Sequence, residues 1–380
     1  MKNILFLPSW FPARTDPFSG DFILRHAISA SLFNRITVFH TAVDSSVTDT
    51  EVTKEKLNDN LSVHTFYYPP SKNAISKNIN GLKRFNALRN MYAEVFTDAA
   101  PDLVHVHVSY PAGLFALYLE KFKGLKYVLT EHNTIYLPAY DNAYVQSGIE
   151  KKINEVIFNN ARNVSVVSNG LGKALENSGL VKSPVVIPNV VDTGIFNYSE
   201  KNLGNIFRFI HVSLLVNQKN PEGMLAALAL VKQQRNDFVL TVVGPGNEKI
   251  KQLVKELKLE EHIIFTGEIP YGKVAEEISK ADAMIHFARY ETFGCVVAES
   301  LCSGVPVIGS DFEIMKELVA DKVNGLLAKE GDINDLAQKI LSFMRKETVF
   351  DFKKIAEESR AKFNYHRVGK MLDEFYQSVS

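Results

Sequence analysis

A regular alternation of short apolar runs and helical segments constrains the fold of this chain most strongly. Apolar runs such as residues 4–8, 207–213 and 238–243 are each followed by a segment whose apolar residues have helical spacing. Successive strand–helix–strand units of this kind build a parallel, doubly wound sheet. The alternation pauses in a polar stretch at residues 198–205 and then restarts, and 380 residues exceed one ordinary domain. The sequence therefore predicts two α/β, Rossmann-like domains joined near residues 190–205.

Composition excludes several classes of protein. Lys plus Arg and Asp plus Glu both number 43, so no net charge attracts nucleic acid. No apolar stretch approaches the eighteen or so residues that a membrane-spanning helix needs, and the N-terminus enters a strand without signal-peptide features. The two cysteines, Cys295 and Cys302, lie too far apart on one predicted helix to form a disulfide bond. We therefore expect a cytoplasmic protein with reduced thiols.

Residues 283–308 combine a buried strand, a polar turn and a helix that begins near Gly294. A helix start presents unpaired N–H groups and about half a positive charge, which suits a phosphate. Here these groups belong to Thr292, Phe293, Gly294 and Cys295. Glu291 and Glu299 flank this start about 12 Å apart along an ideal helix, too far to act as one acid/base pair. They suit opposite ends of a nucleoside diphosphate sugar, although Glu291 as a helix cap and Glu299 as a surface residue are the alternatives.

Further candidate residues follow other predicted strands. Gly20 precedes the helix at residues 22–32, and His107 ends the strand at residues 102–107. His132, beside Glu131, ends the strand at residues 125–130. Ligands of doubly wound sheets bind beyond the carboxyl ends of strands, so these positions are candidates, although isolated histidines are more often structural.

Lys219 lies in the turn between the strand at residues 207–213 and the next helix. A lysine there can supply a point charge to a diphosphate, although the residue on its own favours an ordinary exposed loop lysine. No Asp-x-Asp element ends a strand and no His/Cys cluster has ligand spacing, so the sequence does not require a metal. Neither a G-x-S-x-G element nor a complete dinucleotide fingerprint after Gly244 is present.

A basic segment at residues 71–92 contains no acidic residue. Its cations are Lys72, Lys77, Lys83, Arg84 and Arg89, with apolar residues at helical spacing among them. Such a segment is either a solvated helix face or a surface that meets an anionic acceptor or membrane headgroups.

The stretch from Glu291 to Glu299 resembles the E-x7-E motif of retaining glycosyltransferases of family GT4, which have the GT-B fold. The motif alone is loose, but its surroundings match the family in order. They comprise Ser19-Gly20, residues 102–107 and 187–192 with Phe196, Lys219-Asn220, Gly244, residues 267–270, Ala281-Asp282, residues 298–306 and Asn324-Gly325.

The resemblance implies two Rossmann-like domains that face each other across a cleft. Residues 1–190 with about 365–380 would form the acceptor-side domain, because the family's last helices cross back to it. Residues 205–364 would form the nucleotide-sugar donor domain.

The resemblance also implies roles for individual residues. Glu291 would contact the donor sugar, with His107 nearby, and Glu299 would bind the ribose. The diphosphate would be held by Lys219, Gly20 and the backbone amides of Thr292, Phe293, Gly294, Cys295 and Val296. The segment at residues 268–270, which includes Ile269, would face the base, and Gly244 would lie at the donor.

Two departures from the family pattern concern the diphosphate. Ser19-Gly20 replaces a frequent Gly-Gly, and Ser213-Leu214-Leu215 replaces a frequent Gly-Arg-Leu. The missing arginine removes one cation, so the chain would rely more on Lys219, on helix dipoles or on Arg289.

The implied activity is retaining transfer of a sugar from a UDP- or GDP-sugar to a saccharide or lipid-linked acceptor, without a metal or other cofactor. Surface polysaccharide or glycoconjugate synthesis of the bacterial type would be the setting. Peripheral contact with the inner face of the membrane would occur through residues 72–92, and no nucleic acid is involved. The alternatives are a same-fold epimerase or phosphorylase, and a non-catalytic nucleotide-sugar-binding partner in a polysaccharide-assembly complex.

Overall fold

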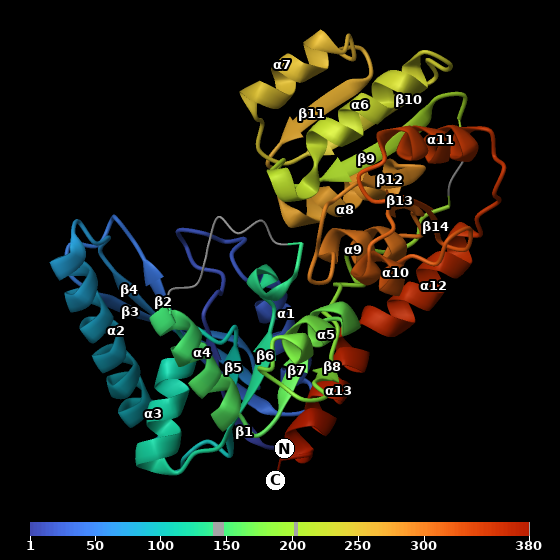
Figure 1. Ribbon diagram of the computed structural model, residues 1–380. Coiled ribbons are helices and arrows are strands. Elements are labelled where there is room, and N and C mark those ends of the chain that lie inside the picture. The colour runs from blue at the N-terminus through green and yellow to red at the C-terminus, as the bar shows by residue number, and fades with distance from the viewer. Residues whose placement is uncertain (140–147, 201–203, 380) are drawn as a thin grey trace. The chain divides into compact units, whose positions relative to one another are not determined.

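The computed structural model describes residues 1–139, 148–200 and 204–379, which form two compact units (Figure 1). The first unit contains Met1–Tyr136, the chain from Gly148 to Val190, and the last helix, α13 (Tyr365–Gln377). The second contains Val191–Asn364. The prediction that the C-terminal helix returns to the N-terminal part of the chain is therefore confirmed.

The first unit is built on an eight-stranded sheet in the order β3-β4-β2-β1-β5-β6-β7-β8. Its strands are β1 (Asn3–Pro8), β2 (Arg35–Val43), β3 (Glu51–Asn58), β4 (Leu61–Tyr68), β5 (Leu103–His107), β6 (Tyr127–Glu131), β7 (Val164–Val166) and β8 (Val185–Val186). All neighbours pair in parallel except β3 and β4. The central strands β1 and β5 are almost entirely buried, and their register places Pro8 beside His107. Both strands therefore end at the same edge of the sheet.

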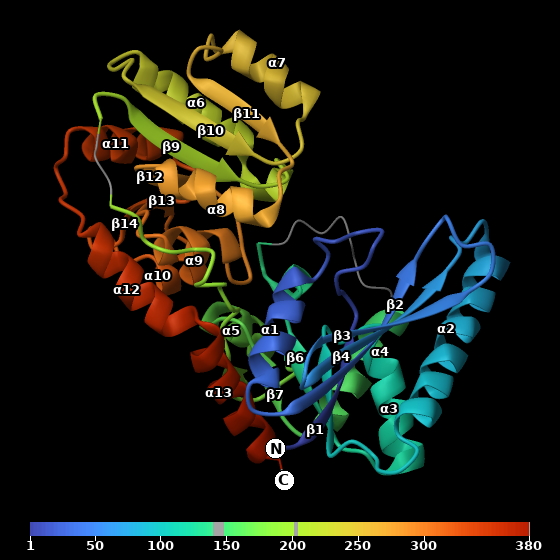
Figure 2. The same ribbon diagram turned by 180° about the vertical axis from the view of Figure 1, so that it is seen from behind.

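Helices cover both faces of this sheet. They are α1 (Asp21–Ser31), α2 (Ala74–Val95), α3 (Gly113–Lys123), α4 (Gly148–Asn160), α5 (Asn169–Asn177) and α13, with a short 3₁₀ turn η1 (Thr134–Tyr136). Helices α1 and α13 lie on one face, and α2, α3 and α4 lie on the other (Figure 1, Figure 2). This is the two-sided arrangement that the alternation of strands and helices predicts.

Close packing holds α13 on α1, and a buried hydrogen bond joins α13 to β5. At Gly369 the two backbones approach so closely that a Cβ atom would lie 2.3 Å from the carbonyl oxygen of Ser29. Further along α13, the Tyr376 hydroxyl lies 2.8 Å from Nδ1 of the buried His105, beneath the sheet. The last helix is thus an integral part of the first unit's core.

The second unit contains a six-stranded sheet in the order β11-β10-β9-β12-β13-β14. Its strands are β9 (Phe207–Val212), β10 (Phe238–Val243), β11 (Ile263–Gly267), β12 (Ala283–His286), β13 (Val307–Ser310) and β14 (Gly325–Ala328). Every neighbouring pair is parallel. This sheet matches the predicted doubly wound pattern.

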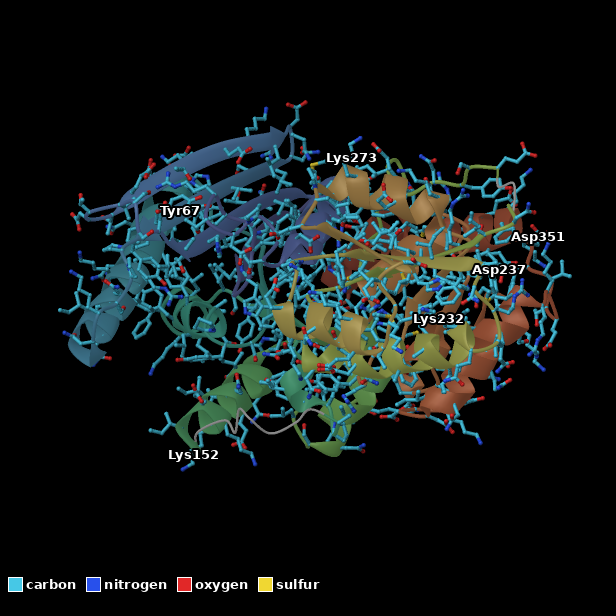
Figure 3. All side chains as sticks on the ribbon, turned by 90° about the horizontal axis from the view of Figure 1, so that it is seen from above. Tyr67, Lys152, Lys232, Asp237, Lys273 and Asp351 are labelled. Atoms are coloured by element: carbon cyan, nitrogen blue, oxygen red, sulfur yellow. The ribbon has the colours of Figure 1, made fainter. Side chains whose placement is uncertain are left out.

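Seven α-helices accompany the described part of this second sheet. They are α6 (Pro221–Lys232), α7 (Glu248–Glu256), α8 (Tyr271–Lys280), α9 (Cys295–Cys302), α10 (Glu313–Leu318), α11 (Ile333–Met344) and α12 (Phe352–Phe363), with a 3₁₀ turn η2 (Asn217–Lys219). Lys232 of α6 and Lys273 of α8 lie on opposite sides of the sheet (Figure 3). Helix α9 follows β12 directly, so the predicted strand–turn–helix unit is present.

Three local predictions differ from the structure. The antiparallel edge strand β3 was not predicted, because its side chains are mostly exposed and lack an apolar pattern. The apolar character of residues 163–170 predicts a longer strand than β7, which ends at Val166 because the Ser168 side chain accepts a hydrogen bond from Leu171 N and begins α5. The apolar run at residues 283–288 stops being a strand at His286, where the chain turns.

Candidate functional site

The partly buried Lys219 and the buried Glu291 form an ion pair in the second unit. Glu291 follows β12 and is only 7% exposed, whereas Lys219 ends η2 after β9. Oε1 of Glu291 also lies 3.0 Å from Nε2 of His286, the last residue of β12. Nearby, Nε2 of Gln218 donates to the carbonyl oxygen of Tyr290 at 3.0 Å. The fold thus joins two candidate residues that the sequence assigns to separate strand–turn–helix units.

This arrangement keeps the Glu291 carboxylate ionised. Burial opposes the charge, but the Lys219 ammonium and the hydrogen bonds from His286 and Lys219 outweigh burial and lower the pKa of Glu291 to about 2. Burial lowers the pKa of His286, only partly offset by its bond to Glu291. At neutral pH the imidazole is therefore uncharged, and its Nε2–H tautomer donates to the carboxylate.

Helix α9 begins directly after this pair. Its N-cap is Gly294 with a φ of 90°, and no side chain caps it, so the alternative that Glu291 caps this helix is wrong. A Cβ atom at Gly294 would meet its nearest neighbour at 3.4 Å, so backbone conformation rather than space favours glycine. The carbonyl of Gly294 accepts the N–H groups of Val297 and Ala298. Helix geometry therefore directs the earlier N–H groups, including that of Cys295, out of the N-terminus.

The side chains around this helix start differ in exposure. Phe293 is buried and packs edge-to-face against Phe363, with ring centroids 5.7 Å apart, so only its backbone can reach a ligand. Thr292, Cys295 and Val296 are partly exposed. Cys295 and Cys302 are both free thiols.

Glu299 lies in the middle of α9 and is 3% exposed, so the alternative that it is a surface residue is wrong. Its Oε1 accepts a hydrogen bond from the Tyr271 hydroxyl at 2.7 Å. Tyr271 begins α8, and the partly exposed Ile269 lies in the turn just before it. Tyr271 therefore holds the carboxylate that the resemblance assigns to the ribose, and it follows the turn that the resemblance assigns to the base.

The loop after β9 lies against Gly244. A Cβ atom at Gly244, which has a φ of 141°, would lie 1.9 Å from the carbonyl oxygen of Ser213. The Ser213 hydroxyl lies 2.7 Å from Nε2 of the buried His211 and accepts the N–H of Leu215 at 3.0 Å. Leu214 is 65% exposed between them. Glycine is thus required for the contact between these two strand ends.

Arg289 is one of the alternatives for replacing the missing arginine, and its role toward a diphosphate stays a prediction. Its guanidinium donates to the carbonyl oxygen of Asn217 at 3.2 Å and to Oδ1 of Asn220 at 3.1 Å. It thereby braces the turn that carries Lys219. In this structure Lys219 and not Arg289 contacts Glu291.

In the first unit, Gly20 caps α1 with a φ of 64°. A Cβ atom there would lie 2.5 Å from the backbone of Trp10, so glycine permits the loop to fold onto itself. The role of Gly20 toward a diphosphate stays a prediction.

His107 ends β5, where it is completely buried among other histidines. Its Nδ1 lies 3.2 Å from Nε2 of His132, and the ring of His26 from α1 lies within 5.7 Å of both. Burial lowers the pKa of all three imidazoles, so they are neutral at pH 7. The Glu131 carboxylate accepts hydrogen bonds from the backbone N–H groups of Ser109, His132 and Asn133, which assigns Glu131 a structural role.

In the part of the chain that the structure describes, the only metal-compatible group of His, Cys, Asp or Glu side chains is this histidine trio. Its nitrogen atoms lie within 4.8 Å of one another. Its members come from three separate elements, so ligand spacing in the sequence could not show it. That the chemistry needs no metal stays a prediction.

Sequence reasoning missed the supporting residues His286, Gln218, Tyr271 and His211. His286 and His211 carried a usable signal, because a polar residue in an otherwise apolar buried strand needs a partner. Gln218 and Tyr271 carried none, because polar residues in turns and at helix starts are ordinary.

Two family descriptions match successive parts of the chain. Residues 34–194 match Glycosyltransferase Family 4, and residues 199–365 match Glycosyl transferases group 1. The chain belongs to glycosyltransferase family 4. This family 4 glycosyltransferase is 28% identical over 282 residues to N-acetyl-alpha-D-glucosaminyl L-malate synthase of Bacillus anthracis, covering 69% of this chain and 70% of that protein.

Solved structures share the fold across the whole chain. Sucrose-phosphate synthase of Thermosynechococcus elongatus has a TM-score of 0.79 at 19% identity and covers 100% of this chain and 99% of its own. HepE of Anabaena, crystallised with UDP and glucose, has a TM-score of 0.76 at 19% identity and covers 100% of both chains. The glycosyltransferase has the GT-B fold, with one Rossmann-like sheet in each unit. No helix among its described residues has the length and apolarity needed to cross a membrane.

Proposed function

We propose that this glycosyltransferase moves a sugar from a UDP- or GDP-sugar to an acceptor hydroxyl with retention of the anomeric configuration. The observation that carries the proposal is the ion pair between the partly buried Lys219 and the buried Glu291, directly before the N-terminus of α9. It places a cation, a fixed carboxylate and outward-directed backbone N–H groups on three adjoining segments. A donor with a diphosphate and a polyhydroxylated sugar needs this combination. The UDP and glucose complex of HepE supports a donor of this class.

In the transfer step, the bond between the sugar C1 and the diphosphate oxygen breaks while a bond to the acceptor oxygen forms on the same face. The acceptor proton passes to the departing phosphate oxygen. Lys219 and the N-terminus of α9 stabilise the negative charge that develops on the diphosphate. The ionised Glu291 accepts hydrogen bonds from sugar hydroxyls and orients C1. A carboxyl group with a pKa of about 2 is a poor proton donor at neutral pH, which favours this positioning role over acid catalysis.

The remaining assignments belong to the same proposal. The ribose contacts Glu299, whose carboxylate accepts the Tyr271 hydroxyl, and the base lies by Ile269. The diphosphate also contacts Gly20, Gly244 and the amides of residues 292–296. His107 contacts the transferred sugar.

We further propose an acceptor that is a saccharide or a lipid-linked saccharide, used in polysaccharide or glycoconjugate synthesis in the cytoplasm at the membrane's inner face. Helix α2 supports this setting, because Lys83, Arg84 and Arg89 accompany the exposed apolar residues Ile79 and Leu82, which are 49% and 67% exposed. Flotation with phosphatidylglycerol vesicles tests it. Leu82→Glu should reduce co-flotation several-fold, with Val323→Glu, at an exposed apolar residue of the second unit, as the control. If the wild type floated equally well with neutral vesicles and with phosphatidylglycerol vesicles, the proposed contribution of the basic residues to membrane binding would be contradicted.

A panel of UDP- and GDP-sugars tests the function itself. We expect one donor to raise the melting temperature and to yield a labelled product with acceptor extracts. Glu291→Ala should reduce transfer far more than nucleotide binding. Saturable donor binding without any product would favour a non-catalytic nucleotide-sugar-binding partner, and conversion of the donor sugar without an acceptor would favour an epimerase.

A further inference from the structure

A pocket in the first unit lies at the carboxyl edge of its sheet, between α2 and α3. Its cavity has a volume of about 170 Å³. Apolar side chains dominate its walls, among them Leu7, Phe39, Phe85, Leu88, Leu114 and Phe115. Apolar cavities of about 150 Å³ accept a molecule of the size of benzene, so the pocket has room for an apolar group of about six carbons.

Among the side chains that the structure describes, Arg84 is the only charged one that lines this pocket. Its Nε donates to the Thr41 hydroxyl at 3.1 Å, and its guanidinium lies 5.4 Å from the centre of the Tyr68 ring. Among the described residues no carboxylate pairs with Arg84. The aromatic ring and the hydroxyl fix the guanidinium in orientation without neutralising it, so its positive charge can attract an anion at the pocket wall.

Backbone contacts connect the pocket to His107. Ser9 lines the pocket, and its N–H donates to the carbonyl oxygen of His107 at 2.9 Å. The Ser9 hydroxyl accepts the N–H of Ala112, another pocket residue, at 3.0 Å. The pocket therefore lies at the same sheet edge as the residue that the proposed function assigns to the transferred sugar.

From these observations we infer that the pocket is an acceptor subsite that binds an apolar group adjacent to a phosphate or carboxylate. The apolar group enters between α2 and α3, and Arg84 binds the anion. This inference rests on the proposed function, because it makes the occupant the molecule that receives the sugar. It narrows the acceptor to an amphiphilic anion, either part of a lipid headgroup with the start of its chain or a soluble organic acid.

Two substitutions test the pocket separately. Arg84→Leu removes the cation and keeps the apolar wall. Gly81→Leu fills the mouth of the pocket, and the structure tolerates it because no atom lies within 4 Å of a Cβ at Gly81. Arg89→Leu is the matched control, since Arg89 is on the same helix outside the pocket, over the ring of Tyr118.

The binding assay uses hexyl phosphate, with inorganic phosphate and hexanol as partial probes, and is read by calorimetry and by fluorescence of the single tryptophan, Trp10, adjacent to Ser9. We expect hexyl phosphate to bind at least tenfold more tightly than either partial probe. Arg84→Leu and Gly81→Leu should each weaken this binding tenfold or more, and Arg89→Leu should not. Unchanged affinity in both pocket variants would overturn the inference.

Competition identifies the source of the occupant. Phosphatidylglycerol vesicles should displace hexyl phosphate if the occupant is a lipid headgroup, and they should fail to do so if it is a soluble acid. Either result supports the pocket. Because the assay contains no donor, a loss of hexyl phosphate binding is distinguishable from a failure of nucleotide-sugar binding, which the donor panel measures.

Discussion

Replacing Lys219 with methionine leaves the buried Glu291 carboxylate without its counter-ion. The depression of the Glu291 pKa from 4.5 to about 2 corresponds to about 3 kcal/mol of stabilisation at pH 7, at about 1.4 kcal/mol per pKa unit. His286 supplies part of this, so Lys219→Met should lower the free energy of unfolding by about 2 kcal/mol. Urea unfolding followed by circular dichroism measures the change. Lys249→Met, which removes an exposed pair with Glu222, is the control and should cost less than about 0.5 kcal/mol.

The pH dependence gives this prediction its sign. A depressed carboxyl pKa stabilises the folded state above the unfolded-state value and loses that effect as the pH falls toward the folded value. The difference between wild type and Lys219→Met should therefore be constant from pH 8 to about 5 and shrink below about pH 4.5. In a double-mutant cycle with Glu291→Gln, the coupling should exceed about 1 kcal/mol. A difference independent of pH, or a coupling near zero, would refute the ion-pair reasoning.

Four further perturbations follow from the same geometry. His286→Leu should lower kcat/KM about tenfold or more, because the buried Glu291 carboxylate loses the hydrogen bond that orients it. His286→Gln should recover part of the lost kcat/KM, and equal kcat/KM values for the two variants would exclude the positioning role. Gly244→Ala would place a Cβ atom 1.9 Å from the Ser213 carbonyl and should lower the melting temperature by several degrees, whereas Gly272→Ala, with nothing within 4 Å, should not. Gly369→Leu should detach α13, seen as faster proteolysis of the C-terminus; unchanged proteolysis would show that the contact is dispensable. EDTA should leave the rate of sugar transfer unchanged. If EDTA instead abolished transfer and one metal ion restored it, the histidine trio would be the candidate metal site.

The sequence predicted the elements that are strongly periodic or fully buried. The strands of the second unit and helix α9 lie where the apolar runs and Gly294 placed them, because a buried parallel strand leaves a continuous apolar signal. The edge strand β3 left no such signal, since the side chains of Glu51–Asn58 are mostly exposed on both faces.

The sequence could predict which residues are candidates for the site, but not which of them contact each other. Nothing in the spacing of Lys219 and Glu291 shows that they share an ion pair, because the parallel order β9–β12 that joins their loops is a property of the whole sheet. The same holds for His26, His107 and His132, which meet only when α1 packs against the ends of β5 and β6. That Leu214 stands in place of a cation stays a prediction, and the contacts of Arg289 with the η2 turn could not be foreseen.

The stereochemistry of the product tests the central claim most directly. Proton NMR of the anomeric signal should be recorded from the product formed with the donor that the panel identifies. An α-linked donor should give an α-linked product in the wild type, and Glu291→Ala should bind the nucleotide and form almost none. A β-linked product, or full turnover by Glu291→Ala, would contradict the account.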